Sequence, residues 1–132
     1  MIAIKTIMKN LLIHRLINTL RKPLKNKFFS FAILFSLFSN IGIWVLIYLY
    51  IQPNNEPISL HYNIYFGIDL IGEWYKLYFI PLSGLIIILV NYLVSAIIYS
   101  SKMVLAYLVI GVTAFVQILL GLAAILIILV NI

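Results

Sequence analysis

The residues of this chain that could carry chemistry gather in one stretch, HYNIYFGIDLIGEWYK at residues 61–76. A histidine, an asparagine, two carboxylates and a lysine lie close together there, between long apolar runs. His61, Asp69 and Glu73 are residue types that bind metal ions, but their spacing matches no metal-binding motif. The chain has no cysteine, which excludes thiolate metal sites, iron–sulfur clusters and cysteine nucleophiles. We therefore expect no metal site and no cofactor.

Asp69 and Glu73 are also candidates for a general acid–base pair. They would lie one turn apart on a helix, but Gly67 and Gly72 argue against a helix at this point. No nucleophile or oxyanion donor accompanies the two carboxylates in the stretch. We expect a protein that is not an enzyme and that has no catalytic residue.

Residues 58–66 alternate between apolar and polar side chains, and this period of two predicts a strand or extended segment. The apolar set is Ile58, Leu60, Tyr62, Ile64 and Phe66. The polar face would hold His61, Asn63 and Tyr65 together. The connection is too short to fold alone, and a lone strand is not stable by itself. We expect it to pack on the end of the helices, on the lipid interface or on a partner.

Two interpretations of this stretch stay open. In the structural one, His61, Asn63 and Asp69 bond the loop's own backbone and fix a turn. In the functional one, the loop recognises a protein or peptide partner.

The stretch resembles the N-terminal domain of the SdpI-type immunity proteins and of a wider family of bacterial membrane proteins around them. The matching residues are Ile58, His61, Tyr62, Asn63, Gly67, Asp69, Gly72 and Lys76. Ser59 stands where that motif has proline, and one extra residue separates Asn63 from Gly67. The resemblance covers roughly residues 28–100. It implies a loop between the first two helices whose residues contact a partner, self-protection against a membrane-acting toxin, and signalling to a repressor.

Long apolar runs place the chain in a membrane. Of its 132 residues, 65% are hydrophobic and 9% are charged, whereas about a quarter of the residues of a soluble domain are charged. A helix needs about 20 residues to cross the hydrocarbon core, and runs at about 28–51, 79–99 and 104–130 reach that length. We expect an all-α fold, a three-helix transmembrane bundle over residues 28–132 with a short extracytoplasmic extended loop at 52–78.

The cations are distributed unevenly along the chain. Seven precede the first run: Lys5, Lys9, Arg15, Arg21, Lys22, Lys25 and Lys27. Lys102 lies between the second and third runs, and only Lys76 lies in the loop. The positive-inside rule then predicts a cytoplasmic N-terminus, with the loop and the C-terminus outside. The expected location is the bacterial inner (plasma) membrane, and nucleic acid is not an expected partner.

Residues 1–27 form a basic N-terminal segment with an interrupted amphipathic pattern. Apolar side chains share one helical face from Ile2 to Leu12, and this face shifts by about half a turn from Ile13 to Leu20. Because one straight helix cannot lay both faces on the same membrane, we expect two short pieces or a partly disordered arm. Pro23 should end the helix. The cations either contact anionic lipid headgroups or only set the topology.

Each apolar run carries one amide near its middle, Asn40, Asn91 or Gln117. Thr113 and Gly121 extend a stripe of small and polar residues around Gln117 on the third run, and Gly84 and Ser95 share a face with Asn91 on the second. Small residues let helices approach closely, and amides bond across the contact. We expect the three amides to meet near one plane inside the bundle. The stripe could equally face a second copy or another subunit.

The leading hypothesis is a small, non-enzymatic integral membrane protein that binds a protein or peptide partner through its outside loop, in an immunity-like role. The second is a structural or accessory subunit of a larger membrane complex, held through the stripe on the third run. The third, a transport component that uses the amides, is less favoured because the runs contain no acidic residue, no basic residue and no histidine.

Overall fold

The computed structural model describes residues 2–63, 65 and 67–132, with every side chain in those ranges except those of residues 2–6, 62, 63 and 69. Its elements, in chain order, are the helices and strands α1 (Ile2–Leu24), α2 (Lys27–Tyr50), β1 (Ile58–Asn63), β2 (Gly67–Gly72), the 3-10 helix η1 (Trp74–Tyr78), α3 (Phe79–Ile98) and α4 (Met103–Asn131). The expected all-α three-helix bundle is confirmed, and α2, α3 and α4 begin and end within two residues of the expected bounds.

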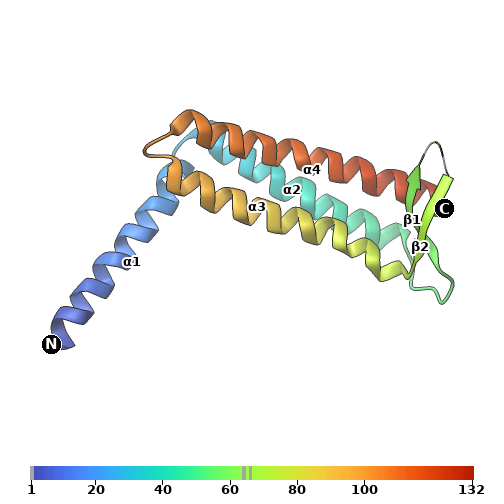
Figure 1. Ribbon diagram of the computed structural model, residues 1–132, viewed down its shortest axis with the longest axis horizontal. Helices are drawn as coiled ribbons and strands as arrows, with labels where there is room; N and C mark the ends of the chain where they lie inside the picture. The colour runs from blue at the N-terminus through green and yellow to red at the C-terminus, as the bar shows by residue number, and fades with distance from the viewer. Residues whose placement is uncertain (1, 64, 66) are drawn as a thin grey trace.

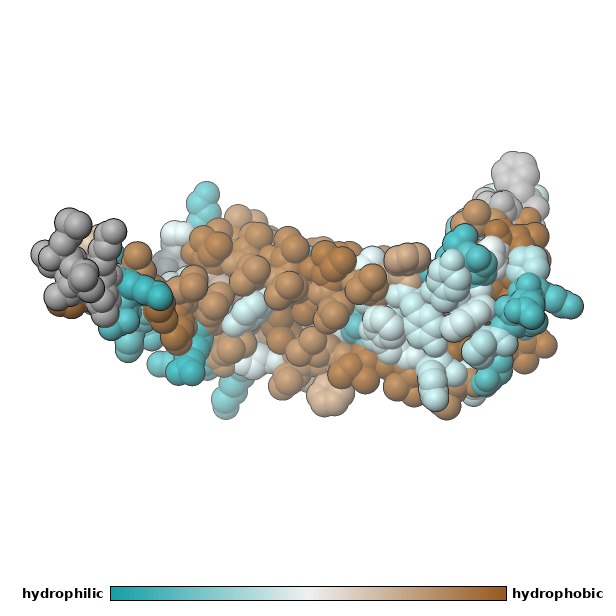
Figure 2. Space-filling model, turned by 90° about the horizontal axis from the view of Figure 1, so that it is seen from below, coloured by the Kyte–Doolittle hydropathy of each residue, from teal (hydrophilic) through white to brown (hydrophobic). Residues whose placement is uncertain are grey.

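The helices α2, α3 and α4 lie side by side and form the bundle. Helix α1 leaves one end of this bundle, and the two strands lie at the other end (Figure 1). The segments Lys27–Tyr50, Trp74–Ile98 and Met103–Asn131 are each long and apolar enough to cross a membrane. Figure 2 shows one face of the bundle as an apolar belt between more hydrophilic surfaces at both ends. The chain is therefore a multi-pass membrane protein.

One uninterrupted helix, α1, occupies the segment for which two short pieces or a partly disordered arm were expected. That expectation was wrong because it assumed that both apolar faces must lie on the membrane surface. A continuous helix needs only its backbone hydrogen bonds, and these form whichever way the apolar side chains face. The segment has no glycine, and its first proline is Pro23. The helix ends at Leu24, one residue after Pro23, as expected of a proline near the end of a helix.

Asn26 begins α2 directly after this helix. Its Oδ1 accepts hydrogen bonds from the backbone N–H groups of Phe28 at 3.0 Å and Phe29 at 3.2 Å. These donors have no partner within the helix, so an asparagine at this position stabilises the helix start. Asn26 thus marks the start of a new helix, at the point where the chain changes direction between α1 and α2 (Figure 1).

The connection between α2 and η1 forms a two-stranded antiparallel hairpin, β1–β2. The predicted strand is confirmed for residues 58–63, whereas β2 was not predicted because the regular alternation of apolar and polar residues ends before Gly67. Gly67 instead has φ +74°, a left-handed conformation that suits glycine at the start of the returning strand. The register is irregular, pairing Ser59 with Ile71 and His61 with Leu70.

The kind of side chain buried inside the bundle changes along its length. At the hairpin end, Ile47, Leu77 and Ile128 belong to an apolar core on which β1 residues pack. At the α1 end, the buried ring of Phe29 lies against aromatic side chains, among them Tyr99 at 5.9 Å between ring centroids. Between these two cores, buried polar side chains face one another.

Candidate functional site

The first candidate is the polar layer in the middle of the bundle, where Asn40 of α2 and Gln117 of α4 meet. Nδ2 of Asn40 donates to Oε1 of Gln117 at 3.1 Å and to the backbone oxygen of Pro81 at 2.9 Å. Nε2 of Gln117 donates to the backbone oxygen of Gly84 at 3.0 Å. Two amides therefore join all three helices at one level, because both also bond to the α3 backbone.

Asn91 does not join this pair, so the expectation of three amides near one plane was wrong. Its Nδ2 donates to Oγ1 of Thr113 at 2.9 Å, four residues before Gln117 on the antiparallel helix α4. Asn91 also lies seven residues beyond Gly84 on α3, about 10 Å along the axis at 1.5 Å per residue. The polar contacts are spread along the α3–α4 interface as separate bonds.

Gly84 is the glycine at which the helices come closest. A Cβ atom at Gly84 would lie 2.6 Å from Nδ2 of Asn40 and 2.8 Å from Oε1 of Gln117. Gly121, which the sequence placed in the packing stripe, would bring a Cβ atom no closer than 3.9 Å to Ile43. The requirement for a small residue therefore lies on α3, facing the amide pair.

Each side-chain nitrogen and oxygen of the amide pair has a hydrogen-bond partner within the protein. Besides its two donor bonds, Asn40 accepts at Oδ1 from the indole Nε1 of Trp44 at 3.2 Å. Among the described residues, every buried side-chain nitrogen or oxygen has a hydrogen-bond partner. Thr113 and Gln117 are buried in this contact and face the other helices of the same chain. Their geometry is that of helix packing in lipid, where polar groups bond across helices.

The second candidate is the hairpin, which the end of α4 holds in place. The side-chain amide of Asn131 accepts from Ser59 N at 2.9 Å and donates to Ser59 O at 2.8 Å. Sequence reasoning missed this residue, although an amide in the last turn of an otherwise apolar helix was a visible signal. Leu60 adds an apolar anchor, since it packs on the core at the hairpin end.

The outer strand β2 is less covered than β1. Of the elements, α4 and η1 lie against β1, while β2 has its main contacts with β1. The described side chains of β2 include three exposed apolar ones, Ile68, Leu70 and Ile71. An exposed strand edge with apolar residues can pair with another chain unless something protects it.

The residues of the sequence motif are distributed over both strands and the segment after them. His61 is exposed and pairs with Leu70, Tyr62 pairs with Ile68, and Asn63 pairs with Gly67. The side chains of Tyr62, Asn63 and Asp69 lie outside the described part of the structure. The prediction that His61, Asn63 and Asp69 fix a turn therefore stays a prediction.

Gly72 and Lys76 complete the motif after β2. A Cβ atom at Gly72 would lie 2.6 Å from Cδ1 of Leu60, so a small residue leaves room for that side chain. Nζ of Lys76 lies 3.3 Å from Oε2 of Glu73, which also accepts a hydrogen bond from the Tyr75 hydroxyl. The hydrogen bond from Tyr75, followed by that from Lys76, lowers the pKa of the Glu73 carboxyl. Its negative charge is thus already paired locally.

Among the described residues, no group of three histidine, cysteine or carboxylate side chains is gathered, and the side chain of Asp69 lies outside them. The carboxylate of Glu73 faces Tyr75 and Lys76.

Basic residues of α1 and of the segment that joins it to α2 form the third candidate. The described cations that the sequence assigned to lipid headgroups are all exposed: Lys9, Arg15, Arg21, Lys22, Lys25 and Lys27. The side chain of Lys5 lies outside the described residues. Lys22 crosses to the turn between α3 and α4, where its Nζ donates to Oγ of Ser100 at 3.0 Å. Tyr92 makes a second link, from its hydroxyl to the backbone oxygen of Leu20 at 2.8 Å.

The chain matches no family model, no curated protein and no solved structure. The resemblance to SdpI-type immunity proteins therefore stays a prediction.

Proposed function

We propose that this membrane protein is non-enzymatic and binds a protein or peptide segment through its hairpin. The observation that carries the proposal is that β1 is fixed to the bundle while β2 is exposed. Asn131 holds β1 against the bundle, and β2 presents exposed Ile68 and Ile71 beside the membrane-spanning helices.

The edge of β2 suits a partner that adds a strand. Proteins usually protect such edges with charges, proline or short strands. The β2 sequence GIDLIG has one charged residue and no proline. A peptide that pairs with a strand edge gains main-chain hydrogen bonds, and apolar side chains along the edge supply specificity. A hairpin already ordered by Asn131 loses less conformational entropy on binding than a mobile loop would.

The charge distribution supports an orientation for this surface. Lys102 and the cations of α1 lie at one end of the bundle, and Glu56, Glu73 and Lys76 lie at the other (Figure 1). By the positive-inside rule, the α1 end is cytoplasmic and the hairpin faces outward from a bacterial inner membrane. The partner is then an extracytoplasmic peptide or protein. The family resemblance makes a membrane-acting toxin the first class to test, in an immunity-like role.

Purification of the full-length protein from its own membranes tests the proposal. We expect a discrete protein or peptide to co-purify with the wild-type chain and to be lost in the double variant Ile68→Thr/Ile71→Thr. Threonine keeps a β-branched side chain for the strand and removes apolar contact area.

Val112→Thr is the matched control, since Val112 is 56% exposed on α4 and Ile71 is 60% exposed on β2. Equal recovery of the same partner with the hairpin double variant and with Val112→Thr would refute binding at the hairpin.

A further inference from the structure

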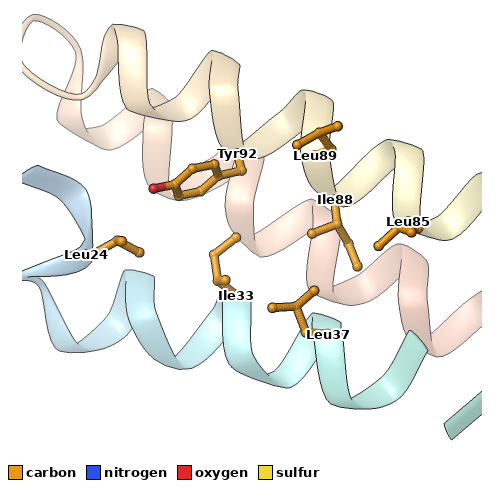
Figure 3. Close-up of a pocket in the computed structure, with 7 residues that line it drawn as sticks. All are labelled: Leu24, Ile33, Leu37, Leu85, Ile88, Leu89 and Tyr92. Atoms are coloured by element: carbon orange, nitrogen blue, oxygen red, sulfur yellow. The ribbon is translucent and has the colours of Figure 1, made fainter. Parts of the chain in front are cut away.

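An apolar hollow of about 280 Å³ opens between α2 and α3, beside the end of α1 (Figure 3). Leu37 of α2 and Leu85 and Leu89 of α3 line its length, and Leu24 of α1 lies at one end. Apart from the Tyr92 hydroxyl, which is engaged by Leu20 O, its lining is hydrocarbon and aromatic ring. Along α3 the hollow extends from Leu85 to Tyr92, about 10 Å at the rise of a helix.

A second hollow is basic, and it is lined by residues that neighbour Leu24 in the sequence. Asn18, Arg21, Lys22 and Lys25 line this second hollow, so that Leu24 borders the apolar one and Lys25 the basic one. The Tyr92–Leu20 hydrogen bond ties this part of α1 to α3. The Lys22–Ser100 hydrogen bond ties the residues that line the basic hollow to the turn after α3. Residues 18–25 thus contribute to both hollows, and this segment is bonded to α3 and to the turn that follows it; we call this region the junction.

No carboxylate near this junction compensates the positive charge. The chain has no aspartate or glutamate before residue 56 or after residue 73, and those residues belong to the hairpin end of the bundle. Three cations within five residues therefore attract an anion at the membrane surface.

We propose that the junction binds one anionic phospholipid. Arg21, Lys22 and Lys25 contact the phosphate, and one acyl chain lies in the apolar hollow along Leu85 and Leu89. The hollow lies on the lipid-facing side of a membrane-spanning helix pair, and the cations lie where the chain leaves the spans. Charge complementarity selects an anionic headgroup, and the apolar hollow selects a lipid over a free phosphate. This site lies at the opposite end of the bundle from the hairpin and does not depend on it.

Native mass spectrometry of the full-length protein in detergent tests the site, with dioleoyl phosphatidylglycerol and dioleoyl phosphatidylcholine added separately. We expect one phosphatidylglycerol to bind at least about tenfold more tightly than phosphatidylcholine. Arg21→Ala/Lys25→Ala should weaken phosphatidylglycerol binding by about tenfold or more and leave phosphatidylcholine binding unchanged. Leu89→Trp, which fills the hollow from an exposed position, should weaken the binding of both lipids.

Two matched controls keep the test specific. Lys9→Ala/Arg15→Ala removes the same charge from exposed positions of α1 outside both hollows, and Val90→Trp adds the same ring at a neighbouring exposed position of α3. Both should bind phosphatidylglycerol as the wild type does. Equal affinity for the two lipids, or the same loss in the controls, would overturn the proposal. Full displacement of phosphatidylglycerol by glycerol phosphate would also overturn it, because the acyl chain would then contribute nothing.

Discussion

The side chain of Asn131 forms two hydrogen bonds with the backbone of Ser59, the same pair that a neighbouring strand would form. Its Oδ1 accepts from Ser59 N at 2.9 Å and its Nδ2 donates to Ser59 O at 2.8 Å, across 72 positions of the chain. Because N–H and C=O of one strand residue point the same way, this side of Ser59 faces away from β2. A single side chain at the end of α4 thus covers part of one hairpin edge and leaves β2 as the open edge.

Replacing Asn131 by leucine should loosen the hairpin and leave the bundle intact. Ser59 is buried, so its unpaired backbone groups should cost about 1–3 kcal/mol. In hydrogen exchange of the full-length protein in nanodiscs, amides of residues 58–60 should exchange about tenfold faster or more. Val130→Ala, one residue earlier on α4, should have no such effect. Unchanged exchange in the leucine variant would show that Asn131 does not hold the hairpin.

Gly84→Ala should destabilise the bundle, because the new Cβ would displace the hydrogen-bonded ends of Asn40 and Gln117. Overpacking of this kind costs about 1–3 kcal/mol. Gly111→Ala on α4 is the matched control, since a Cβ atom there meets nothing within 4 Å. We expect thermal unfolding in detergent to show a lower midpoint for Gly84→Ala and an unchanged or slightly higher one for Gly111→Ala. The reverse order of midpoints would contradict the packing described.

The hydrogen bond between Asn40 and Gln117 can be measured with a double-mutant cycle of Asn40→Ala and Gln117→Ala. Interhelical bonds in membranes are worth about 0.6–2 kcal/mol, so the free energies of unfolding should deviate from additivity by that amount. Asn40→Ala combined with Asn91→Ala should be additive, because Asn91 bonds to Thr113 instead. Coupling of Asn40 to Asn91 that equals its coupling to Gln117 would indicate a single amide cluster.

Glu73 should titrate at a lower pH than an ordinary glutamate. The Tyr75 hydroxyl and the Lys76 ammonium stabilise its charged form, which lowers the pKa of its carboxyl. The stabilisation from these contacts is present above the ordinary pKa and is lost as the pH falls through the lowered one. Carbon-13 NMR of the carboxyl should show a pKa closer to the ordinary value in Tyr75→Phe, with a smaller change in Lys76→Ala. An unaltered pKa in Tyr75→Phe would contradict the contact.

The sequence predicted the three spans well because long apolar runs need no tertiary information. It also predicted β1, where alternation is regular, and the inward position of Asn40 and Gln117, since polar groups in lipid must find partners. It did not predict which amides meet. That outcome depends on the axial position of α4 relative to α3. This position places Thr113 opposite Asn91 and Gln117 opposite Gly84.

The parts of the hairpin that the sequence missed have a similar cause. The pairing of β2 depends on Gly67 starting a returning strand, and a glycine in a strand pattern also fits a break. The role of Asn131 depends on where the end of α4 lies relative to β1, which no local pattern encodes. The candidate surface therefore emerges only when the hairpin and the bundle are placed together.

Site-specific photo-crosslinking in native membranes tests the central claim, binding at the hairpin, most directly. A photoreactive phenylalanine analogue would replace Ile71 on β2 or, in separate proteins, Val45 on α2 and Val112 on α4, all exposed apolar positions. We predict a discrete protein or peptide adduct from position 71 alone, lost when Ile68→Thr is added. Lipid adducts alone at position 71, or the same protein adduct from position 45 or 112, would contradict it.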